Sequence, residues 1–426
     1  MAEIAAFRGI LYSQNAGPAG KLLAPPYDVI SAAERAQLAA LDPHNCVRLI
    51  LPEGDGDEKY AHAARDLRAW LASGVLVRDD QPALYRYHQT FTAEGRTATR
   101  TGFICRIRLH KFSEGVVLPH ERTLAGPKAD RLKLKRACRA HLSQVFGLYS
   151  DPTRESDQPF AGLVQTAPLL DGTTSDGVRQ QLWRLTDAAL QQKVASLLAD
   201  KKVYIADGHH RYETMLALRE ELRAESGGNP RSSVEFGTIF LANMDDPGLL
   251  VFPTHRVVHG LPSFDRAAVL GRAREFFTVE EMPVGDAPSV RARLQSANFA
   301  MVTGDRIAYL TLRKDVDLER VPSLRGPAVL RTLDVTLLHA LMIEEILGID
   351  REAQAAQTNL RYLKDTGQAL AEAHAAQAVF VMNPTKVHEV KAVADAGEVM
   401  PQKSTFFYPK LASGLVINPL VPAESV

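Results

Sequence analysis

Apolar and polar positions follow two different periods along the chain, and together they predict both helices and strands. Alternating side chains at 83–90 and 101–110, joined by a glycine-containing turn at 93–95, predict a β-hairpin. Apolar residues at helical spacing, or behind a capping residue, predict helices at 31–40, 58–73, 130–141, 187–199, 209–225, 265–277 and 332–347. Short apolar runs predict further strands at 4–12, 46–51, 145–149, 182–185, 203–206, 234–243, 299–302, 307–312 and 378–383.

These elements place the chain in the mixed α/β class (α+β), because strands and helices intermingle along the sequence. A length of 426 residues exceeds what one simple core normally holds, so we expect a multi-domain protein. We divide it into an N-terminal α/β region at 1–150, a middle region at 151–260 and a C-terminal α/β region at 261–426.

Composition restricts the class of protein. Hydrophobic residues make up 46% and charged residues 23%, which is ordinary globular usage. Lys plus Arg and Asp plus Glu both number 50, and this balance disfavours a dedicated nucleic-acid binder. Three widely spaced cysteines disfavour a disulfide framework or a cysteine-rich zinc site. Without a basic, apolar leader or a run of eighteen apolar residues, we expect a cytoplasmic protein that does not enter the membrane.

The densest chemical motif joins the apolar run at 203–206 to the helix that follows. It consists of Asp207, Gly208, His209, His210 and Arg211. Glycine permits a close backbone approach, arginine binds phosphate or carboxylate through two N–H groups, and histidine transfers protons near neutral pH. Aspartate can hold Mg²⁺ or orient an imidazole. Four polar groups around one glycine favour a site that binds a small anion over a purely structural turn.

Further polar groups lie in loops elsewhere. His120 and Glu121 offer proton-transfer groups, and Lys128 and Arg131 offer charge for a phosphate. A solvated, salt-bridged loop is an equally good interpretation of that segment alone. We also assign phosphate contacts to Lys403, Ser404 and Thr405, and substrate contacts to Asp28, Arg48, Thr254, His255 and Arg256. The segments 403–405 and 254–256 could equally be ordinary surface.

Several known site motifs are absent from the sequence. Gly20 and Lys21 resemble part of a P-loop, but Asn15 stands where the first glycine is needed and Leu22 replaces the required Ser or Thr. The sequence also lacks HExxH, GxSxG and a GxGxxG turn after a strand.

Five motifs in order resemble the bacterial family named domain of unknown function 1015. They are APPYDV at 24–29, LPHERT at 118–123, IADGHHRYET at 205–214, PTHR at 253–256 and MPQKST at 400–405. The strand–DGHHR–helix stretch is also similar to the ParB/sulfiredoxin superfamily, which includes nucleotide-dependent kinases of free serine. That resemblance covers only residues near 182–260 and implies a ParB/sulfiredoxin-like unit. It also implies nucleotide-phosphate contacts at Gly208 and Arg211, with a separate glutamate as base, for which we choose Glu121.

Three functions follow as hypotheses. The first is a nucleotide-dependent phosphotransferase that uses Mg²⁺ and ATP or ADP on a small hydroxyl metabolite, with serine as the leading acceptor. Here Asp207 holds Mg²⁺ or orients His209, and Glu121 or His120 deprotonates the hydroxyl. The second is a metal-dependent hydrolase or phosphatase with Asp207, His209, His210 and His120 as ligands. The third is a non-enzymatic nucleotide switch. We expect a nucleotide and a small-molecule substrate as partners, and we do not expect nucleic acid to bind. Formation of a homo-oligomer is left open.

Overall fold

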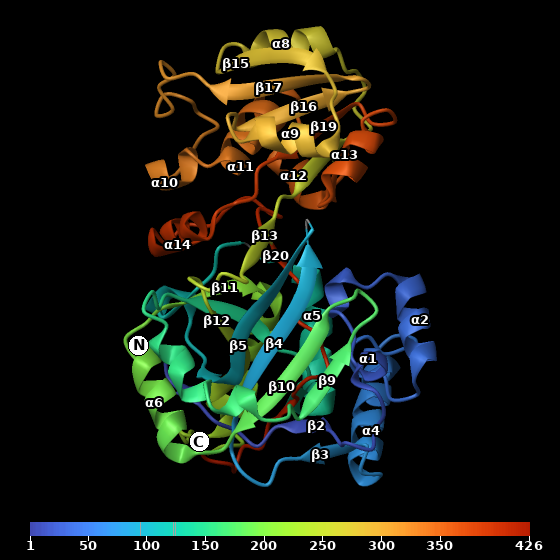
Figure 1. The fold of residues 1–426 in the computed structure, drawn as a ribbon, viewed down its shortest axis with the longest axis vertical. Coiled ribbons are helices and arrows are strands. Elements are labelled where there is room, and N and C mark those ends of the chain that lie inside the picture. Colours follow the sequence, from blue (N-terminus) through green and yellow to red (C-terminus); the bar gives the residue numbers. More distant parts are fainter. Residues whose placement is uncertain (94, 122, 124) are drawn as a thin grey trace. The chain divides into compact units, whose positions relative to one another are not determined.

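The computed structural model describes all residues except 94, 122 and 124. For residues 125–127 it describes the backbone alone. The chain forms two compact units. Unit 1 comprises Met1–Pro119, Thr123–Leu250 and Pro409–Val426, and unit 2 comprises His120–Arg122 and Val251–Tyr408. Both contain sheets and helices, so the predicted mixed α/β class is confirmed (Figure 1).

Unit 1 is built on a nine-stranded sheet in the order β6-β11-β8-β12-β5-β4-β10-β9, with β1 paired to β5. The strands of this unit are β1 (Ile4–Ala5), β2 (Ile10–Tyr12), β3 (Leu76–Arg78), β4 (Leu84–Ala93), β5 (Arg96–Arg108), β6 (Val117–Leu118), β7 (Ala140–His141), β8 (Val145–Tyr149), β9 (Leu170–Thr173), β10 (Arg179–Leu185), β11 (Val203–Asp207), β12 (Phe236–Asn243) and β21 (Asn418–Pro419). Its α-helices are α1 (Ala19–Leu22), α2 (Ala32–Leu41), α3 (Val47–Ile50), α4 (Glu58–Ala72), α5 (Ala125–Cys138), α6 (Ala188–Leu198) and α7 (His209–Leu222).

Two of the hydrophobic clusters in unit 1 support helices α5 to α7. One lies between the sheet and helices α6 and α7, where Val194, Tyr212 and Met215 join buried strand residues such as Val203 and Ile239. The other is formed mainly by α2 to α5 and includes the buried Trp70 and Leu134. Helix α5 contacts both α4 and α7, so α7 is supported by the sheet and by a neighbouring helix.

Unit 2 is built on a six-stranded sheet in the order β15-β17-β16-β19-β14-β18. Its strands are β13 (Leu250–Phe252), β14 (His255–Val258), β15 (Phe277–Pro283), β16 (Phe299–Thr303), β17 (Arg306–Leu312), β18 (Leu360–Leu363), β19 (Ala378–Met382) and β20 (Phe406–Tyr408). Its helices are α8 (Arg266–Ala273), α9 (Ala287–Leu294), α10 (Ala328–Arg331), α11 (Asp334–Leu337), the π-helix η6 (Leu338–Ile346), α12 (Arg351–Ala356), α13 (Thr366–Glu372) and α14 (Val387–Asp395). Helices α9 and α13 pack on one face of this sheet through Val290, Leu294 and Ala369.

The hairpin predicted at 83–110 is confirmed as β4 and β5, and the predicted capping box at Ser31 and Glu34 is present at the start of α2. The predicted strand at 46–51 is wrong, because this segment forms the short helix α3. There the backbone N–H of Val47 donates to Asn45 Oδ1 at 2.9 Å, and the apolar residues of the turn pack beside α4.

Other predicted elements differ in their limits: the helix predicted at 130–141 is α5, which ends at Cys138 before strand β7, and the strand predicted at 4–12 is divided into β1 and β2. The helix predicted at 265–277 ends at Ala273, and Phe277 begins strand β15. The helix predicted at 332–347 consists of α11 followed by the π-helix η6. The three-region division at 150 and 260 also differs from the observed grouping, because strands from 1–150 and from 151–260 are hydrogen-bonded in one sheet.

No helix in the described part of the chain has both the length and the apolar character needed to cross a lipid bilayer.

Candidate functional site

The DGHHR motif forms the turn between strand β11 and helix α7 in unit 1. The pairing register of β11 with β8 shifts between Ile205 and Asp207, which is a bulge at the end of the strand. Gly208 follows with φ of 91° and occupies the N-cap position of α7, where it provides no side-chain hydrogen bond to the helix. An ideal Cβ on Gly208 would lie 2.8 Å from Nε of Arg211, so the glycine also allows the guanidinium to approach the backbone.

Asp207 is held between two cations. Its Oδ2 accepts a hydrogen bond from Nη2 of Arg211, and its Oδ1 accepts one from Nζ of Lys410. Arg211 also donates to the backbone carbonyl of Gln144 and is buried. Burial opposes ionisation of Asp207, but the positive charges of Lys410 and Arg211 outweigh it and hold the pKa of this carboxyl well below its usual range. The turn therefore carries a fixed carboxylate and two cations.

Two basic side chains of α5 lie next to Arg211. Arg131 and Lys135, both on α5, line a cavity of about 20 Å³ together with Tyr27 and Arg211. The guanidinium of Arg131 stacks on the ring of Tyr27 at 4.1 Å, and Lys135 Nζ donates to the carbonyl of Arg211 at 3.4 Å. Burial, followed by the charges of Arg211 and Arg131, places the pKa of Lys135 well below its usual value. This volume admits a water molecule but no phosphate group.

A further contact ties the loop after β6 to α7. Glu213 Oε2 accepts hydrogen bonds from Lys128 Nζ at 2.7 Å and from Thr123 Oγ1 at 2.8 Å. Unit 1 therefore brings together parts of three motifs that lie far apart in the sequence: APPYDV, the end of LPHERT with the residues after it, and IADGHHRYET. Arg122, the remaining polar residue of LPHERT, lies outside the described residues.

Four further residues predicted for a site lie in unit 1, and one of them, His209, also contributes to lowering the pKa of Asp207. His209 is buried and His210 is half-buried in the first turn of α7. Asp28 follows Tyr27 and is exposed. Arg48 donates to the carbonyl of Ala39 at 2.9 Å, which is a structural contact between α3 and α2. Substrate contacts at Asp28 and Arg48 stay predictions.

The other predicted residues meet in unit 2. Glu121 Oε1 accepts a hydrogen bond from the backbone N–H of Ser404 at 3.1 Å, and His120 Nε2 lies 2.8 Å from Thr405 Oγ1. Arg256 is fully buried and donates to the carbonyls of Thr254 and Lys403. The PTHR and MPQKST motifs and the first polar residues of LPHERT therefore form a second cluster.

Two buried histidines complete the second cluster. His339 Nε2 accepts from Nε of Arg256 at 3.2 Å, which places the ring hydrogen on Nδ1, 2.7 Å from Gln354 Oε1. Burial and the charge of Arg256 lower the pKa of His339 to about 3 and that of His255 to about 4. His255 Nδ1 accepts a hydrogen bond from the backbone N–H of Met382 at 3.1 Å, so this imidazole joins strands β14 and β19. Both rings are neutral at physiological pH.

The structure also identifies site residues that the sequence did not indicate. Lys410, Lys135 and Glu213 contact the DGHHR turn or its helix, and Tyr27 stacks on Arg131. Tyr27 and Glu213 lie inside the APPYDV and IADGHHRYET motifs, so membership of these motifs could have identified both as site residues. Lys410 lies 203 residues from Asp207, and no local pattern identifies it.

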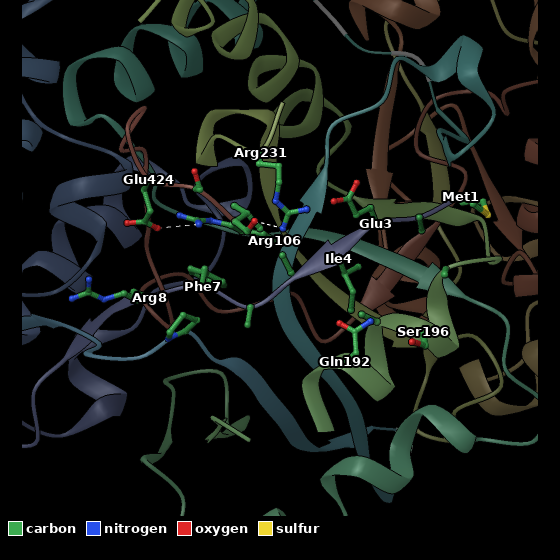
Figure 2. A pocket seen from close by; sticks show the side chains of 18 residues that line it. Met1, Glu3, Ile4, Phe7, Arg8, Arg106, Gln192, Ser196, Arg231 and Glu424 are labelled. Carbon is green, nitrogen blue, oxygen red and sulfur yellow. Dashed lines mark hydrogen bonds and ion pairs between the residues drawn. The ribbon is translucent and has the colours of Figure 1, made fainter. Parts of the chain in front are cut away.

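A larger cavity of unit 1 involves other residues. Its volume is 730 Å³ and it is lined by residues from β1, α6 and the segment 424–426 (Figure 2). Arg106 donates to Glu424 Oε1 at 3.1 Å, and Arg231 donates to the carbonyl of Val426. The DGHHR turn does not line this cavity.

Among the described residues, no three His, Cys, Asp or Glu side chains come together in an arrangement that could hold a metal ion. Both carboxylate oxygens of Asp207 accept from cations, so its present arrangement does not fit a Mg²⁺ ligand. The predicted metal role of Asp207 stays a prediction, and it would require Lys410 to move away.

The fold and these motifs define a mixed α/β protein of two compact units. The chain belongs to the family described as "Protein of unknown function (DUF1015)", whose model matches residues 4–336. The MPQKST motif at 400–405 lies beyond that match. No curated protein matches the chain.

Three solved structures illustrate how distant the structural similarities are. A free serine kinase variant in complex with ADP is 13% identical, with a TM-score of 0.35, over 72% of this chain and 87% of that chain. A conserved hypothetical protein from Pyrococcus furiosus is 14% identical, with a TM-score of 0.36, over 75% of this chain and 97% of that chain. SbnI from Staphylococcus aureus, with a C-terminal truncation, is 9% identical, with a TM-score of 0.36, over 74% and 87%.

Proposed function

We propose that this protein is a nucleotide-dependent phosphotransferase that phosphorylates the hydroxyl group of a small metabolite, with serine as the leading acceptor. The observation that carries the proposal is the DGHHR turn, where Gly208 begins the 14-residue helix α7 beside Arg211 and Lys410. The N-terminus of a helix favours anions, and neighbouring cations strengthen this preference. The resemblance of the motif to that of nucleotide-dependent serine kinases supports the same assignment.

The charges around the turn fit a nucleotide phosphate. Arg211 and Lys410 flank Asp207, and Arg131, which pairs with Asp130, lines a small cavity together with Arg211. Lys410 and Asp207 each keep about a sixth of their side-chain surface exposed, at 17% and 16%. A phosphate would approach from that exposed side and take hydrogen bonds from Lys410 and the first N–H groups of α7. Lys128 of α5 lies one turn further along α7, where it pairs with Glu213.

Phosphoryl transfer to an alcohol breaks the bond between phosphorus and the leaving oxygen of the nucleotide and forms a new bond to the acceptor oxygen. The acceptor proton passes to a general base, for which Glu121 is our candidate. Its carboxylate is oriented by the N–H of Ser404, and 20% of its side chain is exposed. His120 is 1% exposed and contacts Thr405, so it is the weaker candidate for contact with a substrate. Mg²⁺ bound with the nucleotide would offset phosphate charge.

The proposal is tested by incubating the full chain with serine, Mg²⁺ and either ATP or ADP, and following O-phosphoserine by ³¹P NMR. We expect the phosphate ester to form and the nucleotide to lose one phosphate in equal amount. Calorimetry with nucleotide alone reports binding separately. No nucleotide binding at millimolar concentration, together with no phosphate ester from serine, threonine or glycerol, would overturn the proposal.

Glu121→Gln tests the assignment of the base. This variant should keep the nucleotide affinity of the unmodified chain and lose about 100-fold or more in turnover, the range expected for loss of a general base. Glu280→Gln, at an exposed position on β15, is the matched control and should leave both unchanged. If Glu121→Gln retains full turnover, another residue is the base.

A further inference from the structure

Unit 2 contains a cavity of 650 Å³ that the proposed phosphotransfer does not use. Its wall includes His339, Ala340 and Glu344 of the π-helix η6, Gln354 of α12 and the first residues of the MPQKST motif. Its volume lies in the range of small-molecule sites. π-Helical segments are rare and occur frequently at functional sites. The cavity is therefore a candidate for a second ligand site.

The buried wall of the cavity holds an unsatisfied hydroxyl. Thr336 is 9% exposed and lines the cavity, and its Oγ1 is buried without a hydrogen-bond partner among the described residues. Leaving a buried hydroxyl unpaired is unfavourable, so a group that accepts or donates a hydrogen bond here would be bound preferentially. By contrast, both ring nitrogens of the neighbouring His339 have partners.

The cavity also presents one acid and one base that form no ion pair with a described residue. Arg325 is exposed and Glu398 is half-buried, whereas the other charged pair of the lining, Arg351 and Glu344, is joined at 3.0 Å. Glu398 lies beside Gly326, the residue that follows Arg325, because an ideal Cβ on Gly326 would be 3.9 Å from the carboxyl carbon of Glu398. The charged side chains of the lining therefore balance, and Arg325 and Glu398 form no ion pair with each other.

We infer that this cavity binds a free α-amino acid with an aliphatic side chain. The ammonium group of such a ligand would pair with Glu398, and its carboxylate would pair with Arg325 and accept from the hydroxyl of Thr336. Leu330, Ala340, Ala355 and Met400 supply apolar wall for the side chain. A simple anion would leave Glu398 unpaired, and a simple amine would leave Arg325 unpaired, so the zwitterion fits best. This inference does not depend on the proposed phosphotransfer.

The test is calorimetric titration of the full chain with leucine in the absence of nucleotide. We expect a dissociation constant between about 10 μM and 1 mM, the affinity range of a small polar ligand with a few charge-assisted contacts. Serine should bind at least about tenfold more weakly because it buries less apolar surface. The one-charge analogues 4-methylpentanoate and 3-methylbutylamine should also lose at least about tenfold.

Three variants locate the site. Thr336→Val, Glu398→Gln and Arg325→Gln should each weaken leucine binding by about tenfold or more. Thr332→Val and Arg320→Gln are matched controls at exposed positions outside the cavity lining, and both should bind leucine as the unmodified chain does. Absence of leucine binding up to 10 mM, equal binding of the one-charge analogues, or insensitivity to all three variants would each overturn the inference. None of these results bears on nucleotide binding in unit 1.

Discussion

Gly208 combines two requirements that no other residue type meets at the same position. Its φ of 91° lies in the left-handed region, and Nε of Arg211 occupies the space where a side chain would begin, 2.8 Å from an ideal Cβ. Either requirement alone favours glycine. Together they fix the distance between the turn and the guanidinium that pairs with Asp207.

Gly208→Ala should therefore lower the free energy of unfolding by about 2–4 kcal/mol, as strain from the backbone adds to displacement of Arg211. The matched control is Gly74→Ala, at φ of 76° with no atom within 4 Å of the new Cβ, where about 1 kcal/mol is expected. Urea denaturation measures both. Equal losses at the two positions would show that the approach of Arg211 is unimportant.

Lys410, which is distant in sequence, provides one of the two cations that pair with Asp207 at the turn. Replacing it by Met keeps the apolar stem but leaves one oxygen of Asp207 without its cation, so the pKa of Asp207 should rise. We expect a loss of about 1–3 kcal/mol at pH 7 and at least tenfold weaker nucleotide binding. Lys391→Met, which breaks the surface pair with Asp395, is the control and should change stability by less than about 0.5 kcal/mol.

The dependence of this loss on pH has a definite sign. Because the folded pKa of Asp207 is lowered, its ionised form stabilises the protein above the unfolded value of about 3.9. That contribution disappears as the pH falls through the folded value. The difference between Lys410→Met and the unmodified chain should thus shrink below about pH 4. A difference that stays constant from pH 7 to pH 3 would contradict an electrostatic role for Lys410.

Helix α7 connects the turn to the loop that follows β6. Glu213, one turn into the helix, accepts from both Thr123 and Lys128, while Glu221, two turns further on, pairs with Arg136 at 2.5 Å. The first contact holds the beginning of α5 against α7. The second joins exposed side chains.

Glu213→Gln should free the start of α5, because the replacement removes the charge that attracts Lys128. We expect trypsin to cleave after Lys128 several-fold faster, with a stability change of about 0.5–1 kcal/mol, since both side chains are partly exposed. Glu221→Gln is the matched control on the same helix and should leave cleavage after Lys128 unchanged. Mass spectrometry of the early fragments distinguishes the two results.

Elements defined by local chemistry were predicted from the sequence more reliably than those decided by packing. The capping box at Ser31 and the β4–β5 hairpin depend on residues close together in the sequence, and both are confirmed. The turn of the hairpin includes residue 94, which lies outside the described residues. The segment at 46–51 is uniformly apolar, which cannot distinguish a buried strand from a buried helical turn. Its helical form is decided by Asn45 and by contacts with α4, which a single sequence does not reveal.

At the scale of the whole molecule, the candidate site illustrates the same limit. Asp207, Gly208 and Arg211 were predicted because they are adjacent in sequence, and the structure does bring them together. Lys410 reaches them from 203 positions away, and Lys135 reaches Arg211 from 76 positions away. Such pairs depend on the order of strands in the sheet and on helix packing, so only the folded chain shows them.

The two buried, neutral histidines of unit 2 should make its free energy of unfolding decrease as the pH falls. The pKa of His339 is lowered to about 3 and that of His255 to about 4, against about 6.5 in an unfolded chain. Between these values the unfolded state binds more protons than the folded state, so unfolding becomes easier as the pH falls from about 6.5. At pH 5 each imidazole should cost about 2 kcal/mol relative to neutral pH.

Hydrogen exchange of peptides from η6 and β14 measures this loss of stability within unit 2, because His339 and His255 lie in these two elements. His339→Gln removes one titrating group, so the decline in protection between pH 6.5 and pH 5 should shrink. His374→Gln, at an exposed position, should leave the decline as it is in the unmodified chain. If His339→Gln shows the full decline, His339 is not the neutral, buried partner of Arg256 that holds η6 against strand β14.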